Sequence, residues 1–139
     1  MSKILVVDDE EDQEDLIIQR FVNKDLFQDY EFIFARNGLE ALQKIKKYPE
    51  IEILMIDINM PKMDGFTLMK KSKAINPILC FILISAYDDE ANIKSGYEHG
   101  AFEFVNKPID FLLLEDALRR IMLHVEDLRQ SIKAKKGIE

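Results

Sequence analysis

The chain has 139 residues, of which 47% are hydrophobic and 32% are charged, and its formal net charge is -7 at pH 7. These proportions indicate one soluble globular domain and exclude a disordered chain, while the negative charge argues against direct binding to nucleic acid, whose phosphates attract basic surfaces. The single cysteine excludes a disulfide framework. Because the sequence also has no membrane-length apolar run and no signal-peptide pattern, we expect a cytoplasmic protein that does not enter a membrane.

Short apolar runs alternate with amphipathic segments along the whole chain. In chain order, the pattern predicts strands at 3–7, 30–35, 52–56, 79–84 and 102–105, and helices at 10–23, 37–47, 64–74, 88–99 and from about 109. Asn37 is a candidate N-cap and Gly100 a candidate helix stop. The runs ILVV, ILMI and LCFILI are continuously hydrophobic, as is typical of strands that helices cover on both faces. The order therefore predicts an α/β fold, a three-layer α/β/α sandwich around a five-stranded parallel sheet.

Polar residues follow four of the five predicted strands. Asp8 and Asp9 come after the first strand, Asp57 after the third, Ser85 after the fourth and Lys107 after the fifth. Sites in open α/β sheets form at the carboxyl ends of the strands, so these side chains are expected to meet if the first and third strands are neighbours. Each of them alone has an ordinary alternative as a helix cap or a turn residue. Their joint occurrence favours a functional site.

The residue types in this set point to phosphoryl chemistry. Three carboxylates in one cleft repel one another, and Mg²⁺ relieves this repulsion because it prefers a few carboxylates together with water and phosphate. Lys107 would add a positive charge and Ser85 a hydroxyl donor. We therefore expect Asp57 to act as a nucleophile that forms an aspartyl phosphate.

Four segments of the chain, ILVVDDE, MIDINMPKMDG, ILISA and GAFEFVNKP, resemble in residues and spacing the receiver domain of two-component response regulators, over roughly residues 2–124. The resemblance implies a flavodoxin-like sheet with strand order 2-1-3-4-5. It makes Asp57 the phosphoacceptor, supplied by a histidine kinase or phosphotransfer protein. Mg²⁺ would be bound by Asp9 directly, by Asp8 largely through water, by Asp57 and by the backbone carbonyl of Asn59.

The resemblance also implies how the phosphoryl group is positioned and how the domain responds. Ser85 would contact a phosphoryl oxygen together with Lys107, and the Lys107–Pro108 peptide bond would be cis. Ser85 and Phe104 would form the switch, which alters the surface of the fourth helix, fifth strand and fifth helix. Such a protein is not an enzyme beyond catalysing its own phosphorylation and slow dephosphorylation.

Two further positions, and the loop after the phosphoacceptor, carry expectations of their own. Asn59 and Tyr87 lie two residues after Asp57 and Ser85, where the family tunes the access of water, and we expect the bulky Tyr87 to slow dephosphorylation. In the loop, we expect Pro61 and Gly65 to set the backbone path, with Gly65 adopting angles that other residues avoid.

The last segment of the chain has an apolar stripe that extends past the receiver-like region. Six apolar residues alternate steps of four and three, which is a heptad pattern: Leu114, Leu118, Ile121, Val125, Leu128 and Ile132. The first three are expected to pack on the sheet, and the last three to need a partner. We interpret 1–124 as the receiver domain and 125–139 as a helical extension, either a coiled coil that joins two copies or a linker to an output domain. His124 is expected to face solvent.

Other functions compete with a phosphorylatable switch. A phosphohydrolase of the haloacid dehalogenase type requires a second aspartate two residues after the nucleophile, where this chain has Asn59. A flavin-binding protein of similar fold requires a Ser/Thr-rich phosphate loop after the first strand. This chain has DDEED there, which would repel a phosphate. A receiver-like interaction module without phosphorylation would not need the complete set of polar residues at the strand ends.

Overall fold

The computed structural model describes residues 1–60, 62–86 and 90–138, with side chains as far as residue 135. Strands and helices alternate as expected, and each expected boundary lies within two residues of the observed one. The elements are β1 (Ser2–Val7), α1 (Glu11–Phe21), β2 (Tyr30–Ala35), α2 (Gly38–Lys47), β3 (Ile51–Asp57), α3 (Gly65–Ile75), β4 (Cys80–Ser85), α4 (Glu90–Glu98), β5 (Glu103–Asn106) and α5 (Phe111–Ile138). A short 3₁₀ helix, η1 (Asp25–Phe27), precedes β2 and was not predicted.

The five strands form one parallel sheet in the order β2-β1-β3-β4-β5. This is the flavodoxin-like order that the family resemblance implied. Val7 pairs with Ala35 and Ile56, Asp57 with Ile84, and Ser85 with Asn106. The register therefore brings the carboxyl ends of β1, β3, β4 and β5 to one edge of the sheet.

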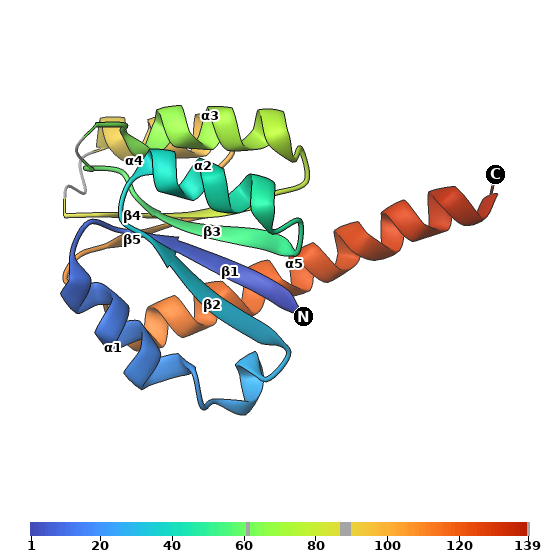
Figure 1. Cartoon of the computed structure of the whole chain (residues 1–139), viewed down its shortest axis with the longest axis horizontal. Helices are drawn as coiled ribbons and strands as arrows, with labels where there is room; N and C mark the ends of the chain where they lie inside the picture. Colours follow the sequence, from blue (N-terminus) through green and yellow to red (C-terminus); the bar gives the residue numbers. More distant parts are fainter. Residues whose placement is uncertain (61, 87–89, 139) are drawn as a thin grey trace.

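Helices cover both faces of the sheet and give it two separate cores. In Figure 1, α2, α3 and α4 lie on one side, and α1 and α5 on the other. Phe21, Phe27 and Leu118 belong to the core under α1 and α5, whereas Leu68 and Phe81 belong to the core under α2 and α3. Full burial of such side chains contributes about 1.5–3 kcal/mol each. The central strands β3 and β4 lie between the two cores and are buried at almost every position, so they are a rigid base for the residues at their ends.

Local signals at the helix ends are mostly as expected. The Asn37 side chain caps α2 by accepting from the backbone N–H of Glu40 at 2.9 Å, and Gly100 follows α4 with φ +98°. The expectation for Gly65 was wrong, because among the described residues only Gly100 and Lys62 have positive φ. Gly65 is required for another reason: a Cβ there would lie 2.7 Å from the Ile58 Cα. Pro61 lies outside the described residues.

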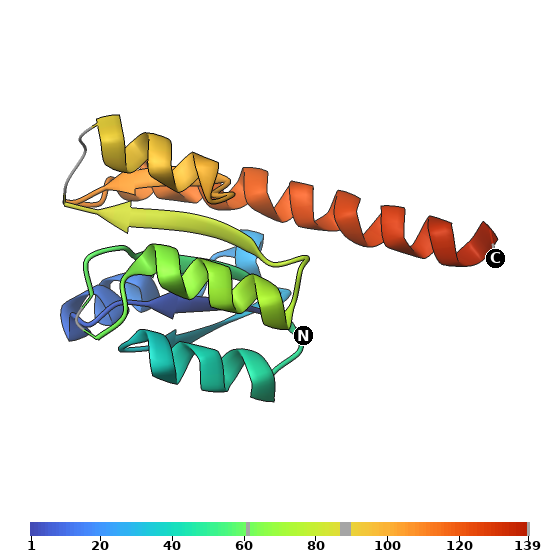
Figure 2. The same ribbon diagram turned by 90° about the horizontal axis from the view of Figure 1, so that it is seen from above.

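Helix α5 continues without a break across residue 124 and projects well beyond the sheet (Figures 1 and 2). Val125 is 4% exposed within the core, and Leu128 packs against that core. These two residues therefore need no partner from another chain, contrary to the expectation from the heptad pattern. The His124 ring is exposed, as expected, and stacks on Phe102 with centroids 5.3 Å apart. Within the described part of the chain, no helix has the length and apolar character needed to cross a bilayer.

Candidate functional site

Four carboxylates meet at the carboxyl edge of the sheet. Asp8, Asp9 and Glu10 follow β1 and Asp57 ends β3, and one oxygen from each lies within 4.8 Å of the others. Asp8 and Asp57 are 9% and 5% exposed, whereas Asp9 and Glu10 face solvent. The local turn has a clear cause, since the Asp8 carboxylate accepts a hydrogen bond from the backbone N–H of Glu10 at 2.8 Å. The sequence singled out Asp8, Asp9 and Asp57 as neighbours, and the structure brings them together.

Lys107 is the cation of this cluster. Its Nζ lies 3.1 Å from Asp57 Oδ2, 3.1 Å from Asp8 Oδ2 and 3.4 Å from Glu10 Oε1. The N–H of Lys107 donates to the Ser85 carbonyl at 2.8 Å, which holds the backbone of Lys107 beside β4. The Lys107–Pro108 bond is cis, as the resemblance implied. Burial lowers the pKa of Lys107, but the hydrogen bonds and charges of Asp57 and Asp8 outweigh burial and raise the pKa above its ordinary value. Lys107 is therefore fully protonated at neutral pH.

The donor set fits a hard divalent cation. Burial raises the pKa of Asp8, while its hydrogen bond from Glu10 and the charge of Lys107 act in the opposite direction. One ammonium group does not neutralise four carboxylates, and oxygen ligands at this spacing suit Mg²⁺, which keeps several waters. Asp8, Asp9 and Asp57 would hold the ion. Glu10 lies close enough to take part, and only its position in the DDE run could have indicated this.

Asn59 connects the phosphoacceptor candidate to Ser85. The backbone N–H of Asn59 donates to Asp57 Oδ1 at 2.9 Å, and its side-chain amide donates to Ser85 Oγ at 2.8 Å. Ser85 ends β4 and is fully buried. The hydrogen bond between the two side chains was not predicted, because a sequence does not indicate which neighbour a loop amide will face.

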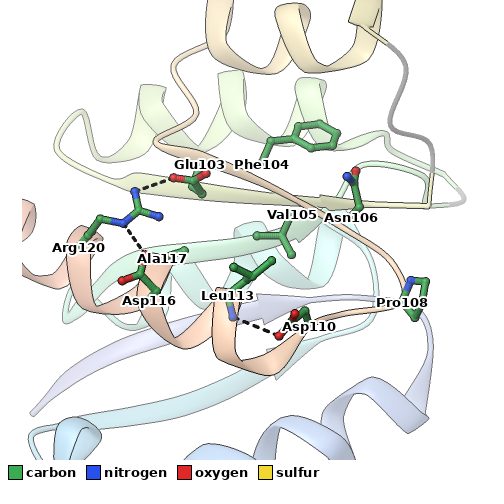
Figure 3. Close-up of a pocket in the computed structure, with 10 residues that line it drawn as sticks. All are labelled: Glu103, Phe104, Val105, Asn106, Pro108, Asp110, Leu113, Asp116, Ala117 and Arg120. Atoms are coloured by element: carbon green, nitrogen blue, oxygen red, sulfur yellow. Dashed lines mark hydrogen bonds and ion pairs between the residues drawn. The ribbon is translucent and has the colours of Figure 1, made fainter.

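Phe104 lies on β5, and β4, which ends in Ser85, separates it from β3 and the acidic cluster. Figure 3 shows its ring on the α4 side of the strand, opposite Val105. Phe104 is half-buried against the core, and it borders a cavity of about 280 Å³ between β5 and the start of α5. Gly96 of α4 packs next to this ring, since a Cβ there would lie 3.4 Å from Phe104 Cδ2 and 2.9 Å from Leu83 Cδ1. Tyr87, the other position expected to tune dephosphorylation, lies outside the described residues.

Comparison with known proteins decides which family shares this arrangement. A family model for the response regulator receiver domain matches residues 4–119. The chain belongs to the response regulator receiver domain family. As a receiver domain, it is of a kind that interacts with histidine kinases or phosphotransfer proteins.

Two kinds of curated relative resemble this receiver domain. It is 32% identical over 121 residues to sporulation initiation phosphotransferase F of Bacillus subtilis, a match that covers 87% of this chain and 94% of that protein. It is 35% identical over 95 residues to the DNA-binding transcriptional regulator NtrC of Escherichia coli, where the match covers 68% of this chain and 20% of the relative. The chain thus spans only about a fifth of the length of the transcriptional regulators that it matches.

Solved structures agree with the fold. The signal receiver domain of an HD domain-containing protein from Pseudomonas fluorescens has a TM-score of 0.82 and 27% identity, over 93% of this chain and 92% of that one. A structure of the CheX-CheY-BeF3-Mg complex from Borrelia burgdorferi has a TM-score of 0.75 and 30% identity, over 87% of this chain and 89% of that one.

Proposed function

We propose that this receiver domain accepts a phosphoryl group on Asp57 from a histidine kinase or phosphotransfer protein and thereby controls an output or partner. The observation that carries the proposal is the 3.1 Å contact between Lys107 Nζ and Asp57 Oδ2 within a cluster of carboxylates. A buried carboxylate with a fixed ammonium group beside it is suited to nucleophilic attack on a phosphoryl group.

The reaction follows from this arrangement. An Asp57 oxygen attacks phosphorus, the new O–P bond forms, and the bond from phosphorus to the donor imidazole nitrogen breaks, with the electron pair remaining on that nitrogen. Lys107 lies where it can offset charge on the phosphoryl oxygens. Mg²⁺, when bound by Asp8, Asp9, Asp57 and the Asn59 carbonyl, supplies further positive charge for the same purpose. The similar complex from Borrelia burgdorferi contains Mg²⁺, which supports this assignment.

The phosphorylated carboxylate then acts as a switch. It adds charge and acceptor oxygens at the end of β3. Ser85 turns towards these oxygens, Phe104 rotates inward, and the surface of α4, β5 and α5 changes. This is a shift between two existing states of the domain. Asn59 and Tyr87 set the lifetime of the phosphorylated state by controlling the access of water to the phosphoryl group. The protein catalyses only its own phosphorylation and slow dephosphorylation.

The remaining parts of the proposal concern partners and location. We place the domain in the cytoplasm, without direct nucleic-acid binding by this segment. The helical extension predicted for 125–139, which includes the last part of α5, joins two copies or leads to an output domain. Because Val125 and Leu128 pack on their own core, a contact between copies would use the helix surface beyond them.

The proposal is tested by phosphorylation in vitro. The protein is incubated with acetyl phosphate and Mg²⁺, and uptake of one phosphoryl group is followed by intact mass. Uptake is expected for the native protein and is expected to be lost in Asp57→Asn and after chelation of Mg²⁺. Asp64→Asn is the matched control, since Asp64 caps α3 by accepting from the Thr67 N–H at 2.9 Å and from the Thr67 hydroxyl at 3.1 Å, and asparagine is an equally good N-cap residue. No uptake by the native protein, or unchanged uptake by Asp57→Asn, would refute the proposal.

A further inference from the structure

One residue, Asn59, contacts both the phosphoacceptor and the switch hydroxyl. Its backbone N–H donates to the Asp57 carboxylate at 2.9 Å, and its side-chain amide donates to the Ser85 hydroxyl at 2.8 Å. The two contacts use different parts of the residue. A substitution of the side chain can therefore remove the bond to Ser85 and keep the backbone bond to Asp57.

The backbone around Ser85 has little freedom to move. The Ser85 carbonyl accepts from the Lys107 N–H at 2.8 Å, and the preceding carbonyl, that of Ile84, accepts from the Ile58 N–H at 3.0 Å. Ser85 also pairs with Asn106 in the sheet. With the strand held on both sides, the hydroxyl reaches a new partner mainly by rotation about χ1, which has three staggered positions. The side chain therefore has discrete alternatives, and the Asn59 amide stabilises the one observed.

We propose that Asn59 is a positioning residue that holds the Ser85 hydroxyl in the unphosphorylated state and must release it for the domain to switch. The inference rests on the proposed function and adds a restraint on the resting state, distinct from any effect of Asn59 on water access. One neutral hydrogen bond shifts a two-state equilibrium by roughly two- to tenfold. Hydrogen bonds to a charged acceptor are about twice as strong as neutral ones. A hydrogen bond from the Ser85 hydroxyl to a phosphoryl oxygen can therefore replace the bond from the Asn59 amide.

The test measures the resting equilibrium directly. In the full chain with Mg²⁺, the NMR signals of the Phe104 ring and of the β4 and β5 amides are compared with those of the native protein before and after phosphorylation by acetyl phosphate. Asn59→Ala is expected to move the unphosphorylated signals towards the phosphorylated positions, with a two- to tenfold higher ratio of switched to resting protein. Asn59→Leu, which has a similar size and no donor, is expected to do the same and serves if the alanine variant folds poorly.

The same Asn59 substitutions made in Ser85→Ala protein distinguish this role from a general loosening of the loop. In Ser85→Ala protein the amide has no hydroxyl to hold, so adding Asn59→Ala or Asn59→Leu should leave the equilibrium unchanged. An unchanged equilibrium in the single Asn59 variants, or an equal change with and without Ser85, would overturn the inference while the phosphoacceptor role stands. If the native protein takes up no phosphoryl group, the proposed function fails and this inference fails with it.

Discussion

Replacement of Arg129 by methionine should destabilise the protein more than loss of a surface ion pair would. Arg129 lies on α5 beyond the region that the family model matches, and its guanidinium forms a two-point contact with the Glu52 carboxylate on β3. It also donates to Ser2 Oγ at 2.9 Å and to Glu126 at 2.7 Å. The side chain thus ties the projecting helix to the amino-terminal edge of the sheet.

The magnitude follows from the burial of the two partners. The Glu52 side chain is 15% exposed, so Arg129→Met leaves a largely buried carboxylate without its cation. Loss of one partner from a fully buried pair costs about 3–5 kcal/mol, whereas an exposed pair contributes about 0–1 kcal/mol. Because Arg129 is itself 37% exposed, solvent screens part of its charge. We therefore expect a loss of about 1.5–3 kcal/mol in the free energy of unfolding, between those limits.

Urea denaturation of the full chain measures this difference. A loss of this size corresponds to a midpoint lower by about 1 M at a typical urea slope. Arg120→Met is the matched control, since Arg120 lies on the same helix, is 46% exposed and pairs with Glu103 and Asp116. Adding Glu52→Gln to Arg129→Met should restore much of the stability, because it removes the stranded charge. The reasoning is refuted if Arg129→Met costs no more than Arg120→Met, or if Glu52→Gln restores nothing.

Three further predictions concern other parts of the domain. Gly65→Ala should lower the free energy of unfolding by roughly 1–3 kcal/mol, because the new Cβ would meet the backbone of Ile58 at 2.7 Å; an unchanged urea midpoint would contradict this. Cys80 is 7% exposed and burial raises the pKa of its thiol, so it should react with a disulfide reagent at pH 8 only as the protein unfolds, and rapid native reaction would count against the packing. Burial also raises the pKa of Tyr30 above its ordinary 10.0. The unfolded chain therefore loses this proton first, so the stability should be intact below pH 10, fall as pH rises through the folded pKa, and fall less steeply in Tyr30→Phe.

The sequence predicted the alternating elements well for a physical reason. The strands β3 and β4 are almost completely buried, so their apolar runs are continuous, and the polar residue that ends each run marks the edge of the sheet. Asp57 and Ser85 were identified in this way. The strand order was not available from the pattern itself, since alternation fixes the parallel sheet but leaves several orders open, and it came from the family resemblance.

The features that the sequence did not predict depend on contacts between distant side chains. The apolar spacing of α5 was clear, but a heptad pattern does not tell whether Val125 faces the same chain or another copy. The role of Gly65 was misassigned for a similar reason, since the approach of Ile58 is visible only in three dimensions. The pairing of Arg129 with Glu52 spans 77 residues of sequence and leaves no local signal.

The most direct test of the whole account is to locate the phosphoryl group. Protein treated with acetyl phosphate and Mg²⁺ is reduced with borohydride, which converts an aspartyl phosphate to homoserine, and the peptide that contains β3 and the following loop is sequenced by mass spectrometry. The account predicts homoserine at position 57 and at no other aspartate. Modification at another residue, or a β3 peptide that remains unmodified while the protein takes up phosphate, would contradict it.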